Sequence, residues 1–238
     1  MEEKFSELLD WLKNAAGPNL KAVVLYGSAV TGEFHEQHSD LNILVVVNEA
    51  GSADLEKLQP VAEWWAKKGN PPPIVFTMDE LTRSADVFAI ELLDMKRHHR
   101  MLLGPDFFEG LDVPMTLHRL QVERELRTAW LQLRRSILTA PRKPEVHLQI
   151  MLRSVSSLCV LFRHGVIALQ HGEAHGKREA VQAMATITGG NPAGFQTILD
   201  LRAGKIKEKD VDVESTLHAY LEFVEVVTNE VDRRLQVA

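Results

Sequence analysis

Two neighbouring stretches decide the fold of this chain: residues 25–32 read LYGSAVTG and residues 39–47 read SDLNILVVV. The first stretch ends a short apolar run, which predicts a buried strand that stops at Gly27. The second stretch is almost entirely apolar after Asp40 and predicts another strand. One strand therefore delivers a Gly-Ser turn, and the next strand starts from polar residues.

The Gly-Ser turn has the chemistry of an anion site. Gly27 lets a ligand approach the backbone closely, because glycine has no side chain to obstruct it. The pattern after the turn predicts a short helix, whose free N–H groups can hold an anion together with the hydroxyl of Ser28. The turn is therefore a candidate binding site for a phosphate-bearing ligand.

Asp40 and Asn42 stand two residues apart where the second strand begins. Strand side chains alternate, so both point to the same side, roughly 6–7 Å apart at the backbone. A hard divalent cation between them would receive oxygen ligands from both. The alternative is that Asp40 only forms a turn before the strand. Asn42, however, is a polar residue inside an apolar strand, where a purely structural strand would be apolar throughout.

The first half of the chain alternates strand and helix patterns. Helical spacing of apolar residues precedes Gly17, and a second helix is expected from Asp54 to about Lys68. Strands are predicted over residues 21–27, 41–47, 73–77 and 87–94. Strands that alternate with helices indicate an α/β layer, and we expect a mixed sheet with helices packed against it.

The second half has the pattern of an all-α helical bundle. From Leu148 to Leu169 the apolar residues step by four and three along the chain, which is the spacing of a helix seam. No segment of this half predicts a strand, and we expect an antiparallel bundle. The change of pattern near Gly110 to Pro114 predicts two domains, residues 1–113 and 114–238.

The two stretches together consist of a strand, the Gly27-Ser28 turn, Gly32 and then Asp40-Leu41-Asn42. This arrangement resembles the DNA polymerase beta-like nucleotidyltransferase superfamily. The plan of a small α/β domain followed by a helical bundle is similar to that of bacterial small-molecule, aminoglycoside-type nucleotidyltransferases. The resemblance implies transfer of a nucleoside monophosphate from a nucleoside triphosphate to a hydroxyl of an acceptor, which is a small molecule or a protein side chain and is not readable from the sequence.

The resemblance also implies roles for individual residues. Gly27 and Ser28 would hold the triphosphate, and Asp40 would bind Mg²⁺. The third carboxylate of the family comes from a later strand, and Glu91 is the best match for it. Glu91 would then bind a second metal ion or accept the proton of the acceptor, and Asp94 is the alternative to Glu91.

Asn42 departs from the family pattern, which has a second aspartate at this position. An amide oxygen can coordinate Mg²⁺, but it supplies no negative charge. We therefore expect a metal-dependent nucleotidyltransferase weakened by Asn42. The alternative is a catalytically inactive relative that binds a nucleotide or a partner.

Composition and charge narrow the class of protein. Residues 1–113 hold 19 acidic and 10 basic residues, a balance of −9, whereas the remainder carries +3. This small basic excess argues against a duplex-DNA binder. The sequence has no long apolar run, its first residues are charged, and its one cysteine is Cys159, so we expect no membrane partner and a cytoplasmic location. A homodimer through the helical half is compatible with the resemblance.

Other polar groups have structural interpretations beside functional ones. His98 and His99 lie among basic residues and have the character of a solvated turn, although phosphate contact is the alternative. Arg134 and Arg135 fit a solvated helix face better than a nucleotide contact. Cys159 falls on the apolar seam and is expected to be a core thiol.

Overall fold

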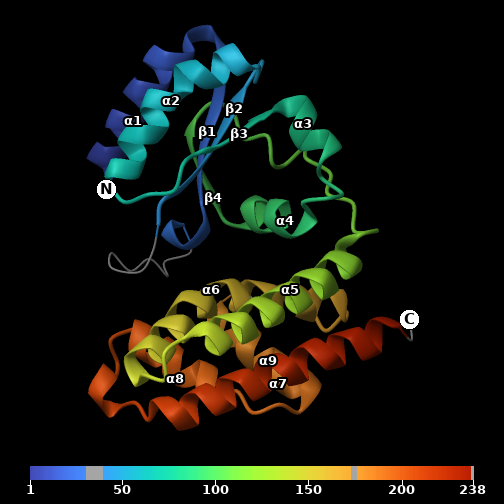
Figure 1. Ribbon diagram of the computed structural model, residues 1–238. Helices are drawn as coiled ribbons and strands as arrows, with labels where there is room; N and C mark the ends of the chain where they lie inside the picture. The colour runs from blue at the N-terminus through green and yellow to red at the C-terminus, as the bar shows by residue number, and fades with distance from the viewer. Residues whose placement is uncertain (31–39, 173–175, 237–238) are drawn as a thin grey trace. The chain divides into compact units, whose positions relative to one another are not determined.

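The protein is described here by a computed structural model that covers residues 1–30, 40–172 and 176–236. The chain divides into two compact units, Met1–Met115 and Thr116–Ala238. The first unit contains a sheet flanked by helices, and the second is helical in the part of it that the structure describes (Figure 1). The sequence pattern placed the change of character at residue 113.

The first unit is built on a four-stranded mixed sheet, as predicted. Its strands are β1 (Leu20–Tyr26), β2 (Asn42–Val47), β3 (Ile74–Thr77) and β4 (His99–Leu103), in the order β3-β2-β1-β4. Strand β1 pairs antiparallel with β2 and with β4, whereas β2 and β3 are parallel. Its helices are α1 (Glu2–Ala16), α2 (Ser52–Lys67), α3 (Met78–Arg83) and α4 (Ala89–Arg97), and short 3-10 turns η1 (Gly17–Asn19) and η2 (Gly27–Ala29) flank β1.

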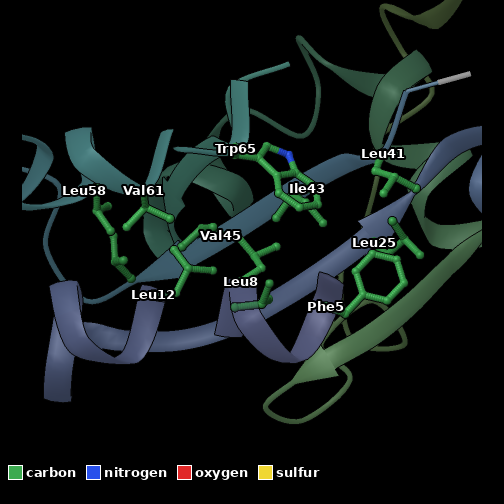
Figure 2. Packing of buried hydrophobic residues seen from close by; sticks show 12 residues of the cluster. Phe5, Leu8, Leu12, Leu25, Leu41, Ile43, Val45, Leu58, Val61 and Trp65 are labelled. Atoms are coloured by element: carbon green, nitrogen blue, oxygen red, sulfur yellow. The ribbon is translucent and has the colours of Figure 1, made fainter. Parts of the chain in front are cut away.

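The two faces of the sheet are covered by different helices (Figure 1). Helices α1 and α2 cover one face, where apolar residues of α1 spaced by three and four pack against Leu25, Ile43 and Val45 (Figure 2). Helices α3 and α4 cover the other face, where Val24 and Leu44 are fully buried. Since each fully buried large apolar side chain contributes about 1.5–3 kcal/mol, both layers are held by the hydrophobic effect.

The strand predicted over residues 87–94 is wrong. Residues Ala89–Arg97 form helix α4, and the fourth strand is His99–Leu103. The segment AIELLDMKR is rich in good helix formers, and its Ala89, Leu92 and Met95 recur every three residues on the buried side. A short apolar run does not by itself distinguish a buried strand from a buried helix, so the length of the run misled the prediction.

The second unit is a set of packed helices. They are α5 (His118–Thr139), α6 (Pro144–Ala168), α7 (Lys177–Thr188), α8 (Ala193–Arg202) and α9 (Val213–Gln236), with a short 3-10 turn η3 (Glu208–Asp210) before α9. No strand occurs among the residues of this unit that the structure describes, which confirms the helical prediction. Its centre is aromatic: Phe195 stacks on Tyr220 with ring centroids 4.1 Å apart.

Helix α6 is the central helix of this unit. It is long and apolar enough to cross a bilayer, but 61% of its most apolar stretch is buried inside the structure. Thirteen of its 25 residues are buried, among them Cys159, which is a core thiol as expected. The apolar character of α6 is therefore accounted for by packing against the neighbouring helices.

Gly104, directly after β4, tests how tightly the sheet is built. Its φ is +84°, and a Cβ there would lie 2.4 Å from the carbonyl oxygen of Lys21 on β1. We expect Gly104→Ala to lower the free energy of unfolding by about 3 kcal/mol or more, because strain and a backbone clash add together. Urea unfolding followed by circular dichroism measures the loss.

Gly69 is the matched control for Gly104. It has nearly the same φ, +83°, but no atom lies within 4 Å of the position of its Cβ. Gly69→Ala should therefore cost only the left-handed conformation, about 1–2 kcal/mol. Equal losses at the two positions would contradict the tight packing of Gly104 against β1.

Candidate functional site

The Gly-Ser turn and Asn42 meet at one end of the sheet. Strand β1 ends at Tyr26, which is paired with Asn42 across β1 and β2. Gly27 follows with φ +80°, and a Cβ there would lie 3.0 Å from Nδ2 of Asn42. The amide of Asn42 therefore lies against the bare Cα of Gly27. The structure thus brings together two of the residues that the sequence singled out.

The side chains at the start of β2 are divided between the two faces of the sheet. Leu41 and Ile43 are buried on the face covered by α1 and α2. By strand alternation, Asn42 lies on the opposite side, together with Leu44. Asp40 precedes β2 by two residues. Asp40 is exposed, and no hydrogen bond or ion pair of its carboxylate occurs among the described residues. Its oxygens are therefore open to a cation or to solvent.

Glu91 reaches the same end of the sheet from helix α4 and not from a strand. Helix α4 packs on the face to which Tyr26 and Asn42 belong, and Glu91 lies exposed in its first turn. Burial raises the pKa of the Tyr26 hydroxyl, and the negative charge of Glu91 raises it further. The Glu91 carboxylate is therefore close enough to act on the end of β1, next to the Gly27 turn.

Tyr26 was missed by sequence reasoning. It packs against the core on the α4 side and sits between Asn42 on β2 and His99 on β4 in the strand register. A tyrosine directly before the Gly-Ser turn is the only sequence signal that marks it. Its position makes it a neighbour of the candidate site.

The remaining predicted site residues are placed less fully. Ser28 lies in η2, directly after Gly27, and is half-buried. Asp94 lies one turn beyond Glu91 on α4, and it already interacts with another group of the protein. Gly32 lies outside the described residues. Among residues 1–30, 40–172 and 176–236, no three His, Cys, Asp or Glu side chains are grouped as a metal site would group them.

The donors at this end of the sheet suit a hard cation in kind. Asp40 and Glu91 carry carboxylates, and Asn42 carries an amide oxygen, all of which are ligand types that Mg²⁺ accepts. Asp40, Asn42 and Glu91 together carry two formal negative charges, whereas a site of three aspartate or glutamate side chains would carry three. The residues present therefore fit a divalent cation, with less charge than a full carboxylate triad.

His99 and Arg100 have structural roles. His99 lies with Nδ1 2.9 Å from the carbonyl oxygen of Met95 and Nε2 2.9 Å from Oδ2 of Asp106. Both neighbours are acceptors, so a ring nitrogen that carries a proton donates to the oxygen that it faces. The hydrogen bond from His99 lowers the pKa of Asp106.

Arg100, the next residue along β4, joins the sheet to the first helix. It donates from both terminal nitrogens to the carboxylate of Glu2, each at 2.6 Å. This pair joins β4 to α1, and the contact of His99 with Met95 joins β4 to the C-terminal end of α4. The basic cluster around residue 98 is thus partly used for packing the first unit.

Known proteins agree with the predicted family resemblance and fold. Residues 3–97 match the model of the nucleotidyltransferase domain family. The resemblance drawn from the motif is thereby confirmed for these residues. No curated protein matches the sequence.

Among solved structures, the chain is similar to the spectinomycin adenyltransferase AAD(9) from Enterococcus faecialis, determined with ATP and spectinomycin. The identity is 16%, the match covers 98% of this chain and 99% of that one, and the TM-score is 0.58. The likeness includes the helical half and shows a common fold.

Two further solved structures match over a smaller part of the chain. One is a toxin–antitoxin with AMP-PNP, at 18% identity, 52% and 93% coverage and a TM-score of 0.34. The other is a tri-AMPylated Shewanella oneidensis HEPN toxin in complex with MNT antitoxin, at 14% identity, 58% and 98% coverage and a TM-score of 0.31.

The position of Glu91 can be measured through Tyr26. The chain has two tyrosines, so a Tyr220→Phe background leaves Tyr26 as the only phenol. In that background, Glu91→Gln should lower the pKa of Tyr26, because a negative charge that opposes the phenolate is removed. Burial should still hold it above the ordinary value of about 10. The phenolate absorbance, followed against pH, reports the shift.

Glu109→Gln is the control for this titration, since Glu109 is an exposed acid of the same unit. It should leave the titration of Tyr26 unchanged. The placement of Glu91 over the end of β1 fails if Glu91→Gln also leaves the curve unmoved while circular dichroism shows an intact fold.

Proposed function

We propose that this protein transfers a nucleoside monophosphate from a nucleoside triphosphate to a hydroxyl of an acceptor, with the help of Mg²⁺. The observation that carries the proposal is the meeting of the Gly27 turn, the Asn42 amide and the charge of Glu91 at one end of the sheet. The family of residues 3–97 supports the reaction class.

The turn supplies the first part of the chemistry. Gly27 allows a phosphate to approach the backbone, and Ser28 supplies a hydroxyl that donates to a phosphate oxygen. Asp40, exposed two residues before β2, provides a carboxylate for the cation. Bound Mg²⁺ supplies charge neutralisation for the phosphate oxygens. These residues would orient the triphosphate at the end of the sheet.

Glu91 completes the proposal as a carboxylate on the α4 side of the site. In one role it accepts the proton of the acceptor hydroxyl, and in the other it is a ligand of a second cation. Its exposure on α4 leaves it accessible for either role. Glu91 remains the candidate in preference to Asp94, which already has an interaction partner within the protein.

Asn42 sets the expected rate. It stands where a second carboxylate would offset repulsion between closely spaced cations, and it supplies a dipole in place of a charge. Charges about 4 Å apart interact by about 4 kcal/mol at an effective dielectric constant of 20. Since each 1.4 kcal/mol of transition-state stabilisation changes the rate about tenfold, we expect a slow enzyme.

The second candidate function is binding without catalysis, and it is favoured by the same asparagine. A chain with this site could hold a nucleotide or a partner and have lost the transfer step. The two functions differ in one result, which is whether restoring a carboxylate at residue 42 creates or raises turnover.

ATP and spectinomycin are the first substrates to test, because the solved structure of similar fold holds both. The helical unit is proposed to contribute to acceptor binding, and the acceptor is proposed to be a polyhydroxylated small molecule or a protein side chain.

The test follows pyrophosphate release and transfer of label from α-³²P-ATP, with Mg²⁺, in the presence of a panel of polyhydroxylated small molecules. We expect Asn42→Asp to raise the transfer rate about tenfold or more, because a charge is added where the cations lie. Asp40→Ala should abolish transfer and Mg²⁺-dependent ATP binding.

Asp10→Ala is the matched control for Asp40→Ala, since Asp10 is also an exposed aspartate of the first unit. It should leave transfer and binding unchanged. Ordinary enzymatic turnover by the native chain, with no gain in Asn42→Asp, would show that the account of Asn42 is wrong. If neither the native chain nor Asn42→Asp transfers nucleotide, but both still bind ATP in a Mg²⁺-dependent way, the result would favour the non-catalytic candidate.

A further inference from the structure

Helix α5 presents a line of leucines to solvent. Leu120, Leu131 and Leu138 have exposed fractions of 65%, 61% and 85%. Their spacings of 11 and 7 residues are close to whole numbers of turns, so they share one side of the helix. This side is opposite to the one that buries Leu126 and Leu133. A surface helix normally turns its polar side to solvent, so a line of exposed leucines is unusual.

Arginines accompany the leucines on the same side of α5. Arg124, Arg134 and Arg135 are exposed, and none of the three forms an ion pair with any residue that the structure describes. Arg134 lies over the ring of Trp130, with 5.6 Å between its guanidinium carbon and the ring centroid. The leucine–arginine face of α5 therefore combines apolar area with unneutralised positive charge.

Helix α9 has the opposite character on its outer side. Glu214, Glu222 and Glu225 are exposed and lie on one side of the helix, opposite to the buried Phe223 and Val227. None of the three glutamates forms an ion pair among the described residues. The glutamate face of α9 thus offers negative charge that nothing in the described part of the chain neutralises.

The C-terminal end of the leucine–arginine face lies at the same level of the helical unit as Glu222 and Glu225 of the glutamate face. Helices α5 and α9 are neighbours that run in opposite directions (Figure 1), and Arg127 of α5 contacts Asp232 of α9 at 2.7 Å. Seven residues beyond Arg127 on α5 is Arg134, and seven residues before Asp232 on α9 is Glu225. Equal steps along antiparallel helices cover equal lengths, so Arg134 and Glu225 stand at one level.

We propose that these two faces bind a second copy of this chain. A two-fold axis parallel to the helices places the C-terminal end of the leucine–arginine face of each copy on the glutamate face of the other, with Arg134 level with Glu225. Such an interface is closed and self-complementary, because each copy contributes both charges. A two-fold axis perpendicular to the helices would instead oppose arginine to arginine.

The leucines favour a protein partner over a nucleic acid. A phosphate backbone would satisfy Arg134 and Arg135 but would leave Leu131 and Leu138 without an apolar neighbour. In the proposed dimer, Leu138 is level with Leu221 of α9, which is half-buried and lies beside the glutamate face. The dimer therefore gives Leu138 an apolar neighbour and pairs the charges at the same time.

Sedimentation velocity of the native chain at low and high salt tests the proposal. We expect a dimer that weakens as the ionic strength rises, because exposed charges are screened. Two double variants reverse the charges of one face each. The first is Arg134→Glu with Arg135→Glu, and the second is Glu222→Lys with Glu225→Lys. Each should weaken the dimer about tenfold or more, since like charges then face each other. Circular dichroism should show native helix content in both.

Mixing the two double variants gives the sharpest result. Reversed α5 then faces reversed α9, and native α9 faces native α5, so two proteins that are monomeric alone should form a heterodimer. The control is the double variant Arg153→Glu with Lys209→Glu. It reverses two exposed charges of the same unit, and neither residue forms an ion pair with a described residue. This control protein should remain dimeric. A monomeric native chain, dimeric double variants or a monomeric mixture would each overturn the proposal.

Discussion

The approach of Asn42 to Gly27 is the contact on which the candidate site depends. A glycine with φ +80° stands where β1 ends, and a Cβ there would meet the Asn42 amide at 3.0 Å. This contact fixes the Gly27 turn and the first polar side chain of β2 at one place. The antiparallel pairing of Tyr26 with Asn42 holds them there, because the register of two buried strands cannot slip without moving their apolar side chains.

The electrostatics of the site follow from which groups gather at this contact. Of the two carboxylates proposed for the site, Asp40 precedes β2 and Glu91 lies on α4, and the amide of Asn42 lies beside the turn. Burial and the Glu91 charge raise the pKa of Tyr26, so its hydroxyl stays protonated at neutral pH. The site therefore combines a neutral phenol, a neutral amide and two acids, which is a weaker cation site than three acids would make. The proposed slow transfer is a direct consequence of this composition.

Much of the fold could be predicted from apolar spacing, and the failures have identifiable causes. Strands β1, β2 and β3 were found because short apolar runs bounded by glycine, aspartate and proline leave few alternatives. Strand β4 was misplaced because residues 87–94 are as apolar as a strand, while their helix-forming composition decides the outcome. Glu91 was therefore assigned to the wrong element, although the structure still brings its charge to the end of β1. Contacts between distant residues, such as Arg100 with Glu2, leave no periodic signal in a single sequence.

Calorimetric titration of the native chain with ATP, with and without Mg²⁺, is the most direct test of the central claim. If the Gly27 turn and the acids beside it form a triphosphate site, ATP should bind, and Mg²⁺ should tighten the binding because it bridges the phosphates and the carboxylates. Absence of ATP binding under both conditions, or binding that is indifferent to Mg²⁺, would contradict the account.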